Sequence, residues 1–210
     1  MKELFIDTAS ARVIVAVLKD HKIIRMCNEE NGHDLSTRIF PLLDEVLKSS
    51  DTILDEIDTI YVVNGPGSFT GVRIGVTIAK TMAWGLKKRI ITLSELELMA
   101  TTEVDADYIV PMIDARREAS FGAIYEKNGD KYFTDCYIKN NDLMKMLPKD
   151  KKNVIVSYDK FTDIETVIPS VNIEEMVIRH CHDEGKNPHE VKPEYLKLTE
   201  AEEKLQKENV

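Results

Sequence analysis

The chain has 210 residues, with 28 lysines and arginines against 37 aspartates and glutamates, so its formal net charge is −9. An acidic chain gains no general attraction to nucleic acid, which depends mainly on neutralising phosphates, so we expect no strong direct nucleic-acid binding. No apolar run approaches the roughly 20 residues that cross a bilayer. The three cysteines are odd in number and far apart, which is typical of a reducing cytoplasm.

The first hundred residues predict a three-stranded antiparallel meander followed by alternating helices and strands. A short apolar run without alternation, as at 59–65, is typical of a strand covered on both faces. Ser94 and Glu97 have the spacing of a capping box and predict a helix start. The expected elements are strands at 4–7, 12–20 and 22–28, a helix at 34–50, a strand at 59–65, a helix at 72–86, a strand at 89–93 and a helix at 94–102.

The second half repeats the pattern of the first. An offset of 107 residues places Ile113-Asp114 over Ile6-Asp7, and the order of elements agrees. Strands are expected within 108–138 and at 153–159, and helices at 141–147 and 173–185, the last ended by Gly185. We therefore predict two related βββαβ lobes in an α/β chain, at 1–102 and 103–198, and an acidic tail at 199–210.

The glycine-rich stretch NGPGSFTGVRIG, residues 64–75, joins a predicted strand to a predicted helix, as phosphate-binding loops do. It lacks the lysine of a Walker loop, and its third glycine comes one position too late for a dinucleotide fingerprint. A structural interpretation is a tight turn, a hydroxyl cap at Ser68 or Thr70, and close packing at Gly71 and Gly75. Direct ligand binding is the alternative.

Asp7 and Asp114 each end the first strand of their lobe. Two carboxylates facing across a cleft could hold a magnesium–nucleotide, with Thr8 nearby, or two metals as in a nuclease, or each could cap its own hairpin turn. The run His180-Cys181-His182-Asp183 resembles a metal cluster, but consecutive helical residues cannot all face one ion. We expect no metal site and no catalytic residue in this chain.

The two longest predicted helices, at 34–48 and 72–86, are apolar over a wider arc than one-sided burial requires. Either the two helices bury the extra surface against each other, or their outer faces bury a partner. The residues that we assign to this candidate interface are Leu35, Ile39, Phe40, Leu42, Leu43, Val46, Leu47, Val72, Ile74, Val76, Ile78, Ala79, Met82 and Ala83.

Four segments resemble the TsaB family, also called YeaZ, and they follow family order along the chain. They are FIDTAS at 5–10, GHDLSTRIFPLLDEVL at 32–47, GPGSFTGVRIGVTIAKTMA at 65–83 and MIDARREASFGAIY at 112–125, with a weaker match, KPEYLK, at 192–197. The resemblance implies the actin/Hsp70/sugar-kinase (ASKHA) fold, with two RNase H-like lobes and mixed sheets.

The resemblance further implies a non-catalytic scaffold for TsaD, the enzyme that adds threonylcarbamoyl to adenosine 37 of tRNA. TsaD carries a helical His-x-x-x-His iron site, and the corresponding helix here, around 72–86, has no histidine. The implied partners are TsaD, a second copy of this chain through the same helices, and the P-loop ATPase TsaE. No cofactor is expected for this chain alone, and ATP with magnesium is expected only at the complex with TsaE.

Two other functions compete with the scaffold. One is a nucleotide-dependent phosphotransferase of the same fold that uses Asp7 and Asp114. The other is a peptidase, which the missing metal ligands and nucleophile pattern argue against.

Overall fold

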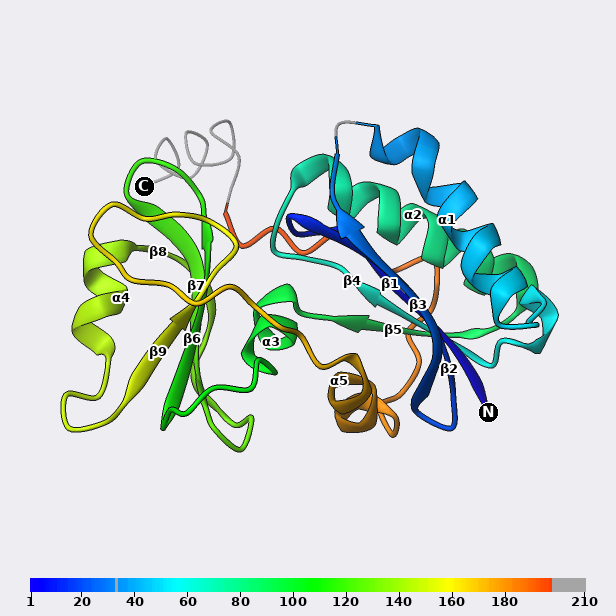
Figure 1. The fold of residues 1–210 in the computed structure, drawn as a ribbon. Helices are drawn as coiled ribbons and strands as arrows, with labels where there is room; N and C mark the ends of the chain where they lie inside the picture. The colour runs from blue at the N-terminus through cyan, green and yellow to red at the C-terminus, as the bar shows by residue number, and fades with distance from the viewer. Residues whose placement is uncertain (33, 198–210) are drawn as a thin grey trace.

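The computed structural model describes residues 1–32 and 34–197, and these form two lobes side by side (Figure 1). Each lobe is built on one mixed sheet, and the four strands of the second sheet follow the order of the first four strands of the first sheet. The first sheet has the order β3-β2-β1-β4-β5, and the second has the order β8-β7-β6-β9. The predicted α/β fold class and the repeat between the two halves are confirmed.

The first lobe follows the predicted meander closely. Strands β1 (Lys2–Asp7), β2 (Arg12–Lys19) and β3 (Lys22–Glu30) are antiparallel, and β4 (Thr59–Val63) and β5 (Arg89–Leu93) run parallel to β1. All five residues of β4 are buried, which explains its unbroken apolar sequence. Helices α1 (Leu35–Ser49) and α2 (Phe69–Leu86) lie together over one face of this sheet, and a short 3₁₀ turn, Leu54–Glu56, precedes β4 (Figure 1).

The second lobe repeats this arrangement with one strand fewer. Strands β6 (Tyr108–Asp114), β7 (Ala119–Glu126) and β8 (Lys131–Lys139) are antiparallel, and β9 (Asn153–Val156) runs parallel to β6. Helix α4 (Asn140–Met146) lies between β8 and β9 in the chain. Asp7 and Asp114 are the last residues of β1 and β6, as the repeat predicts.

Helices α3 (Glu95–Ala100) and α5 (Ile173–His180) lie between the two sheets (Figure 1). Leu96 and Met99 of α3 pack in the apolar cluster of the second lobe. Ile173, Met176 and Val177 of α5 pack in the core of the first lobe, as does Val191. The sheets therefore divide near residue 102, but residues 173–191 return to the first lobe, which differs from the predicted range of 103–198 for the second lobe.

The prediction that Gly185 ends the last helix is wrong, because α5 stops at His180. The ring of His180 binds Asp183 through Nδ1 and Glu97 through Nε2, which fixes the chain in a turn at this point. Gly185 instead lies against Arg89, where a Cβ atom would stand 2.5 Å from the Arg89 Cγ. The predicted tail at 199–210 lies outside the described residues. Within residues 1–32 and 34–197 no helix is both long and apolar enough to cross a membrane.

Candidate functional site

A shallow apolar groove of about 470 Å³ lies between α1 and α2 on the outer surface of the first lobe. Two large apolar side chains on it are well exposed: Phe40 of α1 at 62% and Phe69 of α2 at 56%. The groove is lined by Ser36, Ile39, Phe40, Phe69, Thr70, Arg73, Ile74, Thr77 and Ile78. Contiguous exposed apolar surface of this kind marks an interaction site more often than a solvated face.

The stretch at 64–75 sets the position of α2 against the sheet. Ser68 is the N-cap, and its hydroxyl accepts the Gly71 N–H at 3.2 Å. A Cβ atom at Gly71 would collide with the backbone oxygen of Thr8, and one at Gly75 with the Thr8 hydroxyl. The Thr8 hydroxyl donates a hydrogen bond of 2.7 Å to the Gly71 carbonyl. The glycines therefore let the helix backbone touch the end of β1, which supports the structural interpretation of this loop.

Most of the predicted interface residues face inward, so the sequence prediction needs correction. The burial is caused by the sheet beneath the two helices, which takes up the inner stripe of each. The residues buried in this way are Leu35, Leu42, Leu43, Val46, Val72, Val76, Ala79 and Ala83. Ile39 and Ile78 are also buried but form the floor of the groove. Of the predicted set, Phe40, Leu47, Ile74 and Met82 keep exposed or half-exposed side chains.

Sequence reasoning missed Phe69 and Arg73, which both line the groove. The Arg73 guanidinium carbon lies 3.6 Å from the centre of the Phe69 ring, and its Nε donates to the Tyr195 hydroxyl at 2.7 Å. The four-residue spacing of Phe69 and Arg73 in a helix could have indicated that they touch. Tyr195 lies in the weaker family match, KPEYLK, but nothing in the sequence pattern indicated that it contacts Arg73.

Tyr195 belongs to a C-terminal strap, which we define as residues 187–197, that runs along one flank of α2. Its His189 ring packs edge-on against Trp84, and the carbonyl oxygen of Val191 accepts a hydrogen bond from Lys80 at 2.7 Å. Farther along, the Glu194 N–H donates to the Asn64 carbonyl at 2.7 Å. The segment KPEYLK is thus bound to the segment GPGSFTGVRIG, although more than a hundred residues separate them in the chain.

The two strand-end hairpins, where a nucleotide site is one of the predictions, bind their own polar groups. Oδ1 of Asp7 accepts the Ala9 N–H at 2.7 Å, and Oδ1 of Asp114 accepts the Arg116 N–H at 2.9 Å. Each aspartate therefore caps its own turn. The Thr8 hydroxyl is bound to the Gly71 carbonyl of α2. One turn N–H in each hairpin, that of Ala9 and that of Arg116, is therefore already bound by a carboxylate and not open to a phosphate.

A cavity of about 280 Å³ separates the two hairpins. Ser10 and Ser68 line it from the first lobe, and Asp114, Tyr158 and Asp159 from the second. Asp7 does not line it, and Asp7 as a residue is about 1% exposed. The structure therefore does not bring Asp7 and Asp114 together as a facing pair in an open cleft.

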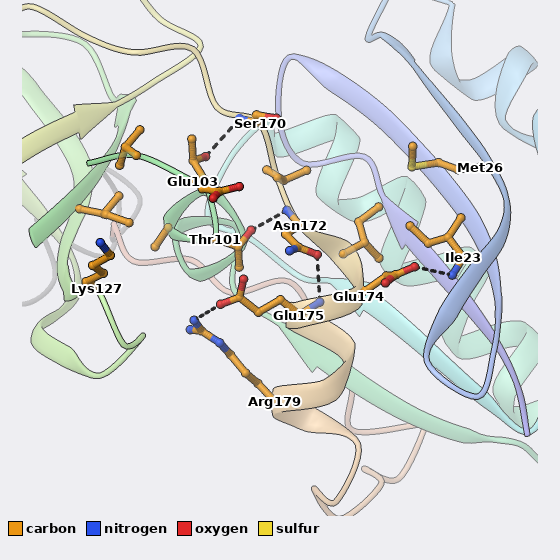
Figure 2. A pocket seen from close by; sticks show the side chains of 16 residues that line it. Ile23, Met26, Thr101, Glu103, Lys127, Ser170, Asn172, Glu174, Glu175 and Arg179 are labelled. Atoms are coloured by element: carbon orange, nitrogen blue, oxygen red, sulfur yellow. Dashed lines mark hydrogen bonds and ion pairs between the residues drawn. The ribbon is translucent and has the colours of Figure 1, made fainter. Parts of the chain in front are cut away.

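A larger cavity of about 660 Å³ lies between β3, α3 and α5, and Figure 2 shows its lining. Its polar groups mostly bind one another. The Thr101 hydroxyl accepts the Asn172 N–H at 2.7 Å, and Glu174 accepts the Ile23 N–H at 3.0 Å (Figure 2). Arg179 pairs with Glu175 (Figure 2). The first two bonds fasten α5 to the end of α3 and to β3, so this cavity is interpreted as a structural joint.

Within residues 1–32 and 34–197 no group of three or more histidine, cysteine, aspartate or glutamate side chains could hold a metal ion. His180, from the run that resembled a metal cluster, is bound instead by Glu97 and Asp183. These hydrogen bonds raise the pKa of His180 against the opposing effect of burial. Cys27, Cys136 and Cys181 are all free thiols.

Two lobes with the same strand order, hairpins facing across a junction and helices between the sheets define a member of the ASKHA fold class. A solved structure from Pseudomonas aeruginosa, described as similar to peptidase YeaZ, has this fold with a TM-score of 0.74. It is 19% identical and is matched over 93% of this chain and 99% of its own.

The sequence comparisons identify the family. The profile of the family described as tRNA N6-adenosine threonylcarbamoyltransferase, TsaD, matches residues 29–203. The tRNA threonylcarbamoyladenosine biosynthesis protein TsaB of Bacillus subtilis is 31% identical over 97% of both chains. TsaB of Escherichia coli is 34% identical over 61% of this chain and 56% of its own. The chain belongs to the TsaB family, as the sequence motifs predicted.

Proposed function

We propose that this chain takes part in the synthesis of N6-threonylcarbamoyladenosine in tRNA as a non-catalytic scaffold for the threonylcarbamoyltransferase. The relatives named TsaB give the pathway. The match to the transferase family supports a common ancestry with the enzyme that this chain would assist. Two chains of one fold can pair through the same helices, as self-complementary surfaces do in symmetric dimers.

The observation that carries the scaffold proposal is the apolar groove between α1 and α2. Phe40 and Phe69 stand on either side of it and are more than half exposed. Ile39 and Ile78 form an apolar floor, and Arg73 stands at the edge. Exposed aromatic side chains and an arginine around an apolar floor are the residues enriched in interaction hot spots. The proposed occupant is the corresponding helical surface of the transferase, with a second copy of this chain as the competitor.

The absence of catalysis is part of the proposal and is supported by the two hairpins. In each hairpin the aspartate binds one N–H, that of Ala9 or of Arg116, and a phosphate that used this N–H would have to displace the carboxylate. The same observation weighs against the alternative phosphotransferase. We propose accordingly that this chain needs no cofactor alone, and that ATP with magnesium acts only where a P-loop ATPase joins the pair. The three free thiols fit a cytoplasmic setting.

A charge placed on the groove tests the scaffold. We expect Phe40→Glu to weaken binding to the transferase at least 30-fold, because a hot-spot aromatic contributes about 2 kcal/mol or more to binding. Tyr132→Glu is the matched control, since Tyr132 is an exposed aromatic residue at 51% on the second lobe. Binding is measured by titration calorimetry and co-elution, with thermal unfolding as a check that each variant folds. Equal binding by both variants would remove this groove from the proposal.

The pathway is tested separately by depletion. We expect cells that lack this chain to lose threonylcarbamoyladenosine from their tRNA, as measured by mass spectrometry of nucleosides. Wild-type chain should restore the nucleoside, Asp7→Asn should restore it too, and Phe40→Glu should not. Turnover of magnesium–ATP by the isolated chain, abolished by Asp7→Asn, would favour the phosphotransferase instead.

A further inference from the structure

Two carboxyl groups that the scaffold does not use are buried where the lobes meet. Asp7 ends β1, Glu95 begins α3, and each is about 1% exposed. Oδ1 of Asp7 accepts the Ala9 N–H, but Oδ2 of Asp7 and both carboxylate oxygens of Glu95 have no hydrogen-bond partner. Buried carboxylate oxygens without a donor are unfavourable, so these three atoms require an explanation.

No basic side chain among the described residues neutralises this pair. The groups that act on the two carboxyls are each other and the hydroxyl of Ser10. Tyr158, which follows β9, faces the pair from the second lobe, and burial and the two acids raise its pKa. Arg12 also acts on Tyr158, but its guanidinium is bound to the side chain and carbonyl of Asn28.

Asp7 and Glu95 act on each other through their carboxyl groups, yet two ionised carboxylates can only accept hydrogen bonds. We propose that Asp7 and Glu95 share a single proton at neutral pH, in a carboxyl–carboxylate hydrogen bond that ties α3 to β1. This bond uses Oδ2 of Asp7 and one oxygen of Glu95. The Ser10 hydroxyl, whose contact with the Arg12 carbonyl is long at 3.5 Å, can turn to donate to the remaining oxygen.

The electrostatics agree with this geometry. Burial raises the pKa of Asp7 to about 7, against the opposing effect of the Ala9 hydrogen bond. Burial, and then the charge of Asp7, raise the pKa of Glu95 well above its ordinary value. Because both values exceed those of an unfolded chain, the stability that the pair gives is present in acid and is lost as the pH rises through the raised values.

The hydrogen bond between Asp7 and Glu95 affects the contact between the lobes, because α3 belongs to both lobes. Its Leu96 and Met99 pack with the second lobe, whereas Glu95 reaches back to the first. Loss of the shared proton would place a second negative charge inside this joint. The contact between the lobes is therefore weakened by base and strengthened by acid, independently of the apolar groove and of any partner.

The test is thermal unfolding of the full chain from pH 5 to pH 9 in the presence of a chelator. We expect the Tm of the wild type to fall by about 4–8 °C between pH 5 and pH 8, given the sensitivity of Tm in chains of this size. Glu95→Gln supplies an amide donor that does not titrate, so its Tm should be flatter with pH and should exceed that of the wild type at pH 8. Asp7→Asn is the second variant, and Asp114→Asn, at the exposed strand end, is the control with an unchanged slope.

Infrared difference spectra supply a direct readout. The wild type at pH 6 should show a carbonyl band of a protonated carboxylic acid that both Asp7→Asn and Glu95→Gln remove. A flat Tm profile for the wild type, or the same slope in Glu95→Gln as in the wild type, would overturn the proposal. The proposal would also be overturned if magnesium or calcium ions raised the Tm of the wild type at pH 8 but not that of Glu95→Gln. The pair would then bind a cation instead of a proton.

Discussion

Asp7 and Asp114 occupy the same position in two copies of one fold, yet their surroundings are opposite. Both end the first strand of their lobe and both accept an N–H from the residue two positions later. Asp7 is buried beside Glu95, whereas Asp114 is exposed, and its own N–H donates to Asp159 at 2.8 Å. Glu95 follows β5, a strand that the second sheet lacks. An added strand and helix, rather than the repeat itself, therefore decide the environment of the acid.

The helix glycines of the first lobe and Gly122 of the second lobe also differ in their surroundings. A Cβ atom at Gly71 would meet the backbone of Thr8, which cannot move aside, whereas one at Gly122 would meet only the end of the Leu143 side chain at 2.7 Å. We expect Gly71→Ala to lower the free energy of unfolding by about 3 kcal/mol and Gly122→Ala by about 1 kcal/mol. Urea denaturation measures both.

Gly85 is the control for this comparison, because it lies in the same helix as Gly71 and a Cβ atom there would meet nothing within 4 Å. Gly85→Ala should stabilise the chain by up to about 1 kcal/mol through helix propensity. Equal losses for Gly71→Ala and Gly122→Ala would show that the two lobes do not differ in this respect.

The C-terminal strap gives a further comparison, because it is bound along α2 of the first lobe. Arg73→Ala removes the hydrogen bond to Tyr195 and the contact with Phe69. We expect a loss of about 1 kcal/mol, with Tyr195→Phe costing about half as much, because the contact is partly exposed. Hydrogen exchange of the Glu194 amide, which is bound to Asn64, should be faster in both variants. Unchanged exchange there would mean that Arg73 does not hold the strap.

The smallest effect is expected at His180, which joins α5 to α3. The hydrogen bonds that His180 donates to Glu97 and Asp183 raise its pKa above the ordinary value, so its contribution is full below about pH 6.5 and is lost as the pH rises through the raised value. We expect His180→Gln to cost about 0.5 kcal/mol at pH 6 and less at pH 9. NMR titration of the ring should give a raised pKa in the wild type, and a lowered value would contradict the assigned contacts.

The elements of both lobes could be predicted because local patterns agree with the fold. The unbroken apolar run of β4 and the Ser94 cap, whose hydroxyl accepts the Glu97 N–H, are formed by neighbours in sequence. The repeat of 107 residues placed Asp7 and Asp114 at equivalent strand ends. The motifs identified the family, and the comparisons confirmed it.

The interface was harder to predict because periodicity gives the width of an apolar face but not what covers it. Val76 and Leu43 are both less than 5% exposed, so a glutamate at either position would disrupt the fold and not only an interface. The residues that contact Arg73 and Asp7 could not be predicted from the sequence for another reason. Tyr195 and Glu95 come from distant segments, and only the folded chain brings them within reach.

The return of the chain to its first lobe has a consequence for the order of events at the ribosome. Ile173, Met176, Val177 and Val191 complete the core that begins with β1. The first lobe therefore cannot complete its folding before the second lobe is synthesised, because part of its core is translated after the whole second sheet. During synthesis the sheet of residues 2–93 keeps the apolar surface that residues 173–191 cover in the finished protein exposed. A nascent chain stalled before residue 173 would expose this surface to chaperones.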